Sequence, residues 1–292
     1  MKENKSGLYI IRGVFSRPGL AGIFSFLFFV FLGYFLLWQR FQILNEGELR
    51  EMSNIINLVE NNVEQSLQNS YSVALSLSLL VDKEGNIDNF EGIAPRLVDG
   101  NPNIDVVQLV PGGIITKVYP LEGNREVINY NILKENSLKR EANKAIETRK
   151  MYFAGPFELK QGEIAVVGRL PVFIKKEFWG FSAVIIKLEN LLRQSGIKKL
   201  AGGKYQFQFS KKEVLTGKEI FFLPEIKNLN KSYSKSVRLP DGEWKVYIAS
   251  KNPNEILFLV LPIGFLILIL ASVVGVDNFQ GVGATCGVAG NA

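Results

Sequence analysis

The chain carries two long, uncharged apolar stretches near its opposite ends, residues 20–38 (LAGIFSFLFFVFLGYFLLW) and 256–274 (ILFLVLPIGFLILILASVV). Each stretch has 19 residues, close to the ~20 that a helix needs to cross the hydrocarbon core of a bilayer. A charged side chain at the bilayer centre costs about 2.5–3.5 kcal/mol, so the absence of charge favours membrane spans. We therefore predict two transmembrane helices, which hold the 217 residues between them outside the membrane.

Charges next to the first stretch predict the orientation of the chain. Residues 1–19 hold four basic residues and one acidic residue: Lys2, Lys5, Arg12, Arg17 and Glu3. Because basic flanks of a span stay in the cytoplasm, we expect a cytoplasmic N-terminus and a short cytoplasmic tail at residues 275–292. The protein would be a multi-pass protein of the cell (inner) membrane, with its ectodomain in the periplasm or extracellular space. The alternative is a cleaved signal peptide, but no A-x-A cleavage site follows the stretch.

The composition excludes several classes of function. The chain contains no histidine, which rules out histidine-dependent catalytic triads, histidine-ligated zinc and a phosphoaccepting histidine. The single cysteine, Cys286, lies in the predicted tail, so the ectodomain has no disulfide. The net charge of +6 is spread along the chain without a basic block, so no nucleic-acid partner is expected. We expect no metal, no cofactor and no catalytic residue.

Residues 39–80 have the spacing of one long helix. Apolar residues recur every three or four positions between Phe41 and Leu75, and no proline interrupts them. At 1.5 Å per residue such a helix is about 60 Å long. We interpret it as a stalk that continues the first span and pairs with a second copy in a homodimer. The alternative is a helix that packs along its own domain.

Residues 81–199 combine strand and helix patterns. The strand patterns lie at 104–110, 114–119, 151–159, 164–173 and 178–188, and a helical pattern lies at 137–149. Short connections between the last three strands require antiparallel neighbours. Two strands, a helix and a three-stranded meander form the element order of a PAS-like fold, whose curled sheet surrounds a small pocket. We therefore predict that residues 81–199 form a PAS-like lobe with such a pocket.

Residues 200–253 predict a second, smaller sheet. Strand patterns occur at 205–209, 235–239 and 243–249, and Pro240-Asp241-Gly242 is a turn signal between the last two. We interpret this region as a membrane-proximal PAS-like lobe. The predicted fold class is thus α+β, with a long stalk helix and two PAS-like antiparallel-sheet lobes between two transmembrane helices.

The middle of the chain resembles the CHASE family of extracellular sensor domains. The segments that carry the resemblance are 118–124 (VYPLEGN), 139–147 (KREANKAIE), 154–162 (AGPFELKQG), 169–173 (RLPVF) and 178–192 (FWGFSAVIIKLENLL). The resemblance covers roughly residues 45–250 and is strongest over 104–192. It implies a sensor that precedes a histidine kinase, nucleotide cyclase or diguanylate cyclase, with a stalk helix, a ligand-binding distal lobe and a smaller proximal lobe.

The chain departs from this family in two respects. Only residues 275–292 follow the second apolar stretch, so we expect the output domain to be missing from this chain. The cytokinin-receptor branch of the family binds adenine through an aspartate before the GPF-like turn. Counted back from Pro156, that place is Leu138 here. Because leucine can neither donate nor accept a hydrogen bond, the resemblance does not imply cytokinin recognition at this position.

Arg169 is the most distinctive candidate for ligand binding. It lies in an otherwise apolar strand pattern (IAVVGRLPVF), where alternation places it on one face with Ala165 and Val167. If that face lines the pocket, the guanidinium could bind a carboxylate or phosphate with two hydrogen bonds. The alternative is a solvated strand charge, or one paired with Glu158 or Glu163.

Further candidates for the pocket are two tyrosines and an alanine. Tyr119 and Tyr130 flank the 120–124 segment, and each could offer an aromatic wall and a hydroxyl group, although core packing is the alternative role. Ala154 and Leu138 match family positions that line the pocket. The predicted ligand-binding residues are therefore Tyr119, Tyr130, Leu138, Ala154, Val167 and Arg169.

Other charged residues favour a solvated surface. Asp105, Glu122 and Glu163 are the candidates for a glycosidase pair, but Glu122 and Glu163 fall in predicted loops. The Lys-Lys-Glu triplets at 175–177 and 211–213 are interpreted as turns. We conclude that the chain is a sensor that is not an enzyme. The alternatives are a membrane-anchored enzyme such as a cell-wall hydrolase, and a scaffold that only dimerises.

Overall fold

The computed structural model describes residues 18–286 except 160–161, 201, 214–215, 227–228, 230–231, 239–242 and 253–254. The predicted turn at Pro240-Asp241-Gly242, most of the predicted cytoplasmic N-terminus and the last six residues of the tail therefore lie outside the described residues. The chain divides into two units. We call residues 1–50 with 252–292 the terminal unit, and residues 51–251 the central unit.

Helix α2 (Pro18–Ser78) takes in the first apolar stretch and the predicted 39–80 helix without a break. In the terminal unit the apolar stretch exposes its large side chains, such as Phe24 at 67% and Phe31 at 68%. Among the described residues, α2 alone is long and apolar enough to cross a membrane. Helix α7 (Glu255–Cys286) covers the second stretch. Among the described residues its apolar segment is Phe258–Leu270, which is shorter than a membrane span requires. The second span therefore stays a prediction.

Glycines bring α7 and α2 close together within the terminal unit. A Cβ atom added to Gly33 would lie 2.3 Å from Cγ2 of Ile267, and one added to Gly264 would lie 3.0 Å from Cδ1 of Leu37. Small residues let two helix backbones approach in this way, which is how apolar helices associate where water cannot drive packing.

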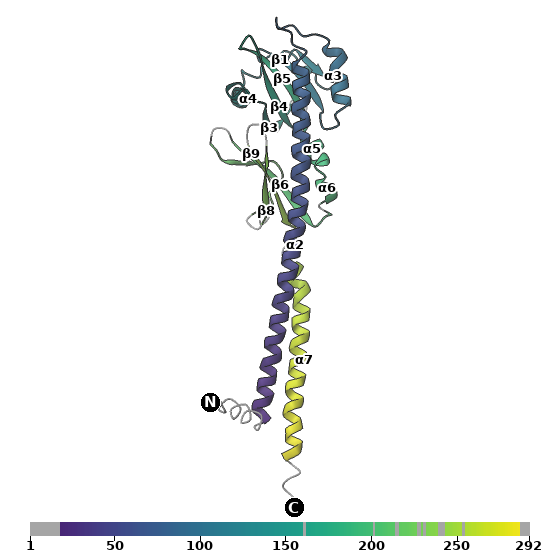
Figure 1. Ribbon diagram of the computed structural model, residues 1–292, viewed down its shortest axis with the longest axis vertical. Helices are drawn as coiled ribbons and strands as arrows, with labels where there is room; N and C mark the ends of the chain where they lie inside the picture. Colours follow the sequence, from purple (N-terminus) through teal and green to yellow (C-terminus); the bar gives the residue numbers. More distant parts are fainter. Residues whose placement is uncertain are drawn as a thin grey trace, which may run out of the picture. The chain divides into compact units, whose positions relative to one another are not determined.

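The second half of α2 is part of the core of the central unit. Its buried apolar residues recur every three or four positions: Met52, Ile56, Val59, Val63, Leu67, Val73, Ala74 and Leu77. The interpretation of residues 39–80 as a stalk is thus wrong for residues 52–77. The alternative, a helix packed along its own domain, describes them correctly, because this stripe is covered by the chain's own strands (Figure 1).

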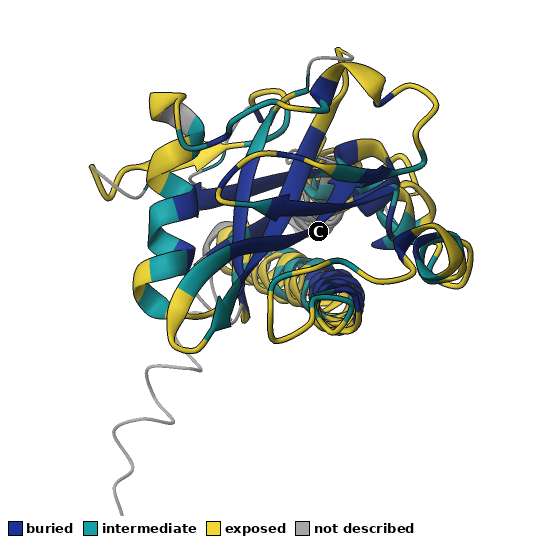
Figure 2. Cartoon of the chain, turned by 90° about the horizontal axis from the view of Figure 1, so that it is seen from above, coloured by how far each residue is buried: buried dark blue, intermediate teal, exposed yellow. Residues whose placement is uncertain are grey.

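The larger lobe, residues 81–199, is built on a five-stranded antiparallel sheet with the order β2-β1-β5-β4-β3. Its strands are β1 (Val106–Pro111), β2 (Lys117–Tyr119), β3 (Tyr152–Glu158), β4 (Ile164–Ile174) and β5 (Glu177–Lys187). The predicted hairpin and the predicted meander are both confirmed. Figure 2 shows the strands largely buried and the peripheral connections exposed.

Short helices precede, connect and follow these strands. They are α3 (Phe90–Asp99), the 3-10 helix η1 (Arg125–Val127), α4 (Asn136–Thr148), α5 (Leu188–Gln194) and α6 (Ile197–Leu200). Helix α4 is the predicted 137–149 helix, and it packs against β3 and β4. Helix α3 has no counterpart among the predicted elements, because Pro95 interrupts its pattern in the sequence.

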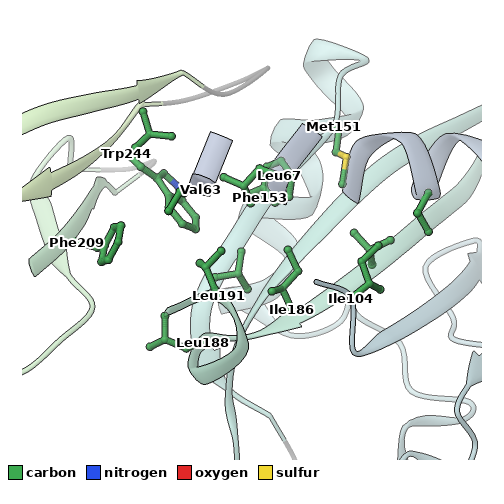
Figure 3. Close-up of a cluster of buried hydrophobic side chains, with 14 of the residues drawn as sticks. Val63, Leu67, Ile104, Met151, Phe153, Ile186, Leu188, Leu191, Phe209 and Trp244 are labelled. Carbon is green, nitrogen blue, oxygen red and sulfur yellow. The ribbon is translucent and has the colours of Figure 1, made fainter. Parts of the chain in front are cut away.

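The smaller lobe, residues 200–251, holds a four-stranded antiparallel sheet with the order β7-β6-β9-β8. Its strands are β6 (Tyr205–Lys212), β7 (Glu219–Phe221), β8 (Tyr233–Arg238) and β9 (Glu243–Ser250). Both lobes share one apolar cluster with α2. Figure 3 shows part of this cluster, including Phe209 and Trp244 from the smaller lobe and Phe153 and Ile186 from the larger lobe.

The two faces of the five-stranded sheet bury different clusters. Successive side chains of a strand point to opposite faces, so in β4 Val166 and Leu170 join the cluster shared with α2, whereas Val167 joins a second cluster with α4. We call the first the filled face and the second the hollow face. The α+β fold with a long N-terminal helix and two antiparallel sheets is thereby confirmed.

Candidate functional site

The hollow face of the larger lobe contains a cavity of about 380 Å³. Strands β1, β4 and β5 form its floor, and side chains of the connection between β2 and α4, of α4 itself and of the end of β3 form its walls. The lining is mostly apolar, with a few polar groups. A concave, largely apolar space with few polar groups is typical of a small-molecule site.

Arg169 lies in the floor of this cavity and is only 4% exposed. Its Nη1 atom is buried and has no hydrogen-bond partner among the described residues. Burial lowers the pKa of Arg169 to about 10, and the nearby carboxylate of Glu141 opposes that shift. Arg169 is therefore charged at neutral pH and is not the solvated strand charge considered as the alternative.

The acidic partners proposed as alternatives do not neutralise Arg169. Glu163 forms an ion pair with Lys187 at 2.6 Å. Glu158 lines the same cavity, but within the described part of the chain no ion pair joins it to Arg169. The guanidinium thus keeps part of its hydrogen-bonding capacity in a site removed from water, which is the condition for strong binding of an anion.

A buried ion pair between Glu141 of α4 and Lys211 of β6 lies close to Arg169. The side chain of Lys211 is 7% exposed and that of Glu141 is 16% exposed. The second oxygen of Glu141 accepts a hydrogen bond from the backbone N–H of Gly155 at 2.9 Å. Burial lowers the pKa of Lys211, and its attraction to Glu141 opposes the shift. This pair connects the larger lobe with the smaller lobe.

The interpretation of residues 211–213 as a turn is wrong for Lys211. The residue belongs to β6 and is buried. Alternation along the strand was the signal that could have found it, because Tyr205, Phe207 and Phe209 precede it at every second position and are all buried. The other triplet does form a turn, in which Lys175 and Lys176 have positive φ between β4 and β5.

Four of the six predicted ligand-binding residues meet at the cavity: Tyr130, Leu138, Val167 and Arg169. Tyr119 packs against the filled-face cluster instead. The reason is its register, since it pairs with Val107, whose side chain also belongs to the filled face. Ala154 is buried in the hollow-face cluster but does not line the cavity.

Sequence reasoning missed several polar residues of the lining. Gln108 is 6% exposed and is the only polar residue of β1, which was a usable signal. Asn124 lines the cavity as well, and its side-chain amide donates a hydrogen bond to the Pro120 carbonyl at 2.9 Å, which closes the turn. Glu135 could not have been found by pattern, because it lies outside any strand or helix.

The three carboxylates considered for glycosidase chemistry do not form a pair. Asp105 accepts hydrogen bonds from the backbone N–H of Lys187 at 2.7 Å and from Asn190 at 3.3 Å. Glu122 is exposed, and Glu163 is engaged with Lys187. None of the three lines the cavity. Among the described residues, no three acidic, cysteine or histidine side chains gather where they could hold a metal ion.

Comparison with known families identifies the region that contains this site. Residues 99–222 match the family model of the CHASE domain. The matched CHASE region includes Arg169 and the other cavity-lining residues, together with both partners of the Glu141–Lys211 pair. The predicted resemblance is therefore confirmed over this region. No curated protein sequence matches the chain.

Two solved structures of ligand-binding proteins have a similar fold, and a third structure is similar at a lower TM-score. An extracellular ligand-binding receptor from Desulfohalobium retbaense is 14% identical with a TM-score of 0.54, over 68% of this chain and 39% of that one. The ligand-binding domain of the amino acid chemoreceptor PctB from Pseudomonas aeruginosa PAO1, in complex with L-Arg, is 10% identical with a TM-score of 0.52, over 71% and 89%. The sensory domain of the Campylobacter jejuni chemoreceptor Tlp3 is 15% identical with a TM-score of 0.49, over 73% and 97%.

Proposed function

We propose that the chain is an extracytoplasmic sensor that binds a small molecule in the hollow-face cavity and signals across the membrane. The observation that carries the proposal is the charged, buried Arg169 in the floor of the cavity, with no hydrogen-bond partner for Nη1 among the described residues. The match of residues 99–222 to the CHASE domain supports it. Tyr130, Leu138, Val167 and Arg169 are the proposed ligand-binding residues.

The proposed signal leaves the cavity through two elements. Glu141 and Lys211 join α4 to the smaller lobe. The C-terminal half of α2 packs against the sheet, and its N-terminal end contains the first apolar stretch. Ligand binding would shift the equilibrium between two arrangements of these elements, in proportion to the difference in affinity for each. The proposal includes two membrane spans, a homodimer formed through α2, and an output domain that receives the signal.

A ligand screen on the full chain in lipid nanodiscs tests the binding part of this proposal. Amino acids, organic acids and purines are added separately, and unfolding is followed by tryptophan fluorescence. We expect at least one class to raise the Tm, because a ligand that binds only the folded state stabilises it. The expected shift disappears in Val167→Trp, which fills the cavity, and persists in Ile164→Trp, which changes an exposed position of the same strand. Equal shifts in both variants would contradict the proposal.

A fused reporter tests the signalling part. The chain is joined after its last residue to a cyclase output domain, and residues 200–251 are deleted in a second version. We expect ligand to change the output of the first version alone, whereas both versions still bind it. Output that follows the ligand without the smaller lobe would rule out this route.

The two alternative functions make different predictions. A cell-wall hydrolase would need paired carboxylates, and Asp105, Glu122 and Glu163 are engaged or exposed separately. A zymogram on peptidoglycan would detect such an activity. A scaffold that only dimerises would show no thermal shift with any metabolite.

A further inference from the structure

We propose that the cavity selects a small organic acid with one negative charge and an apolar body, and that its carboxylate binds between Arg169 and Gln108. This inference deepens the proposed function and rests on it. It concerns the chemical class of the ligand, which the fold alone leaves open. Three observations carry it: the charge balance around Arg169, a row of residues across the floor of the cavity, and the character of the walls.

Arg169 is a charge of this region that has no ion-pair partner among the described residues. Glu141 and Lys211 lie near it, and Glu213 lies near Lys211 as well. Lys211 forms its ion pair with Glu141, whose other oxygen is already hydrogen-bonded to the backbone of Gly155. A buried charge without a full partner is costly, and the cost falls when an opposite charge arrives. One negative charge on a ligand would supply the partner that Arg169 lacks.

The register of three adjacent strands forms a niche in the floor. Gln108 of β1 pairs with Ala183 of β5, and Ala183 pairs with Arg169 of β4. All three residues line the cavity. Because neighbouring strands are about 4.8 Å apart, Gln108 and Arg169 are about 10 Å apart at the backbone, with only the methyl group of Ala183 between them. A carboxylate fits in this niche, where the guanidinium donates to one side and the Gln108 amide to the other.

The remainder of the cavity favours an apolar body on the same ligand. Apolar side chains of several elements form its walls: Val110, Ile115, Val127, Leu138, Phe157 and Ile185. A volume of about 380 Å³ suits a small molecule rather than a peptide. The other charged lining residues are Glu135 and Glu158, which are both exposed. They would repel a second negative charge, which disfavours phosphate and dicarboxylates.

Matched pairs of probes test the charge requirement on the full chain in nanodiscs. The acids are 4-methylvalerate and phenylacetate, and each is compared with its neutral amide of the same shape. Succinate and inorganic phosphate test the limit of one charge. We expect Kd from calorimetry to be about 10- to 100-fold lower for each acid than for its amide, because hydrogen bonds to charged groups contribute about 1.5–3 kcal/mol. Succinate and phosphate should bind more weakly than both acids.

Two variants connect this preference to the niche. Arg169→Met removes the charge, and its matched control Arg125→Met removes an exposed charge of the same lobe. We expect the first variant to lose about 10- to 100-fold in affinity for the acids and none for the amides, whereas the control changes neither. Ala183→Leu fills the niche and should abolish binding of both. It also serves as the second variant if Arg169→Met does not fold.

The outcomes separate this inference from the proposed function. Amides that bind as well as the acids, acids that bind Arg169→Met unchanged, or phosphate as the best probe would each overturn the inference. A neutral or cationic metabolite that binds the cavity, is blocked by Ala183→Leu and ignores Arg169→Met would also overturn it, while the sensor function would stand. Failure of every compound in the ligand screen would count against the sensor function itself.

Discussion

The two faces of the five-stranded sheet are made by the same strands but are stabilised in different ways. On the filled face, α2, α3 and α5 cover the sheet, and Val184, Ile186 and their neighbours are packed without exposure. On the hollow face, α4 and the connection before it leave a cavity over Val167, Arg169 and Ala183. The comparison shows where this fold can change shape, because a close-packed face transmits strain whereas a hollow one can accept a ligand.

Different interactions hold each face. The filled face depends on apolar packing with α2, to which Ser182 adds one hydrogen bond at 2.6 Å from its hydroxyl to the Ala74 carbonyl. The hollow face buries a second apolar cluster with α4, to which the contacts of Glu141 with Lys211 and with Gly155 add polar interactions. Loss of the buried ion pair should therefore be the most costly change on the hollow side, whereas loss of apolar contacts should cost more on the filled side.

The largest expected effect concerns the ion pair on the hollow side. Glu141→Gln keeps an oxygen for the Gly155 N–H but leaves the Lys211 ammonium buried without its anion. Breaking a buried pair in this way costs about 3–5 kcal/mol of unfolding free energy. Chemical unfolding of the full chain in nanodiscs, followed by tryptophan fluorescence, measures it.

The control for this prediction removes both charges. Glu141→Gln combined with Lys211→Met should recover most of the lost stability, because no uncompensated charge remains. If the double variant is as unstable as the sum of the single variants, the pair has no coupling energy and the hollow face is held by other contacts.

Adjacent residues of β5 give a direct comparison of the two faces. Ile186 is fully buried on the filled face, whereas Ile185 lines the cavity. Ile186→Ala should cost about 2–5 kcal/mol, since it leaves a cavity in a packed core. Ile185→Ala only enlarges an existing cavity and should cost less than half as much. Equal losses in the same unfolding experiment would mean that the hollow face is as tightly packed as the filled one.

Added side-chain volume should lower the stability on the filled face and change it little on the hollow face. A Cβ atom on Gly168 would lie 2.2 Å from Cε of Met151 and 2.9 Å from Cε1 of Phe153, both on the filled face. Gly168→Ala should therefore cost about 1–3 kcal/mol through overpacking. Ala183→Val extends into the cavity and should leave the Tm of the unliganded chain within a few degrees. A Gly168→Ala variant as stable as the native chain would show that the side chains of the filled face can move to accommodate a methyl group.

The smallest expected effect is a pH dependence where α2 meets the smaller lobe. Hydrogen bonds from Lys204 and Tyr205 hold the pKa of Glu51 below its usual range. Because the pKa is lower in the folded state, the stabilisation is complete above pH 4.5 and is lost as the pH falls through the folded value. The pair is half exposed, so the effect is about 0.2–1 kcal/mol. Thermal unfolding between about pH 7 and pH 3 should show it as a difference between the native chain and Glu51→Gln.

Strand and helix patterns were sufficient to predict most elements of the larger lobe. The hairpin, the meander and α4 were predicted because their apolar periodicity is local, and the short connections left only antiparallel pairing. Helix α3 and strand β7 were missed, since Pro95 hides one and the other has only three residues, Glu219–Phe221. The stalk was a wrong prediction for residues 52–77, because periodicity shows which side of a helix is apolar but not what covers it.

The residues of the candidate site likewise fall into those that a local pattern predicts and those whose position depends on distant segments. Alternation along β4 was enough to place Arg169 on the same face as Val167, because the side-chain period of a strand is a property of the backbone. Tyr119 lies apart from the cavity because its face depends on its pairing with Val107, which lies in another strand. Lys211 escaped notice because its partner, Glu141, is 70 residues away.

By itself the sequence determined the periods of the helices and strands, the apolar stretch that can cross a membrane and the face of β4 that carries Arg169. These follow from local backbone geometry and from the cost of placing charge in an apolar medium. Tertiary structure alone decided that one face of the sheet is filled by α2 and the other left hollow, and that Gln108, Ala183 and Arg169 form one row. Such outcomes depend on which distant segments cover each face, and no local pattern records them.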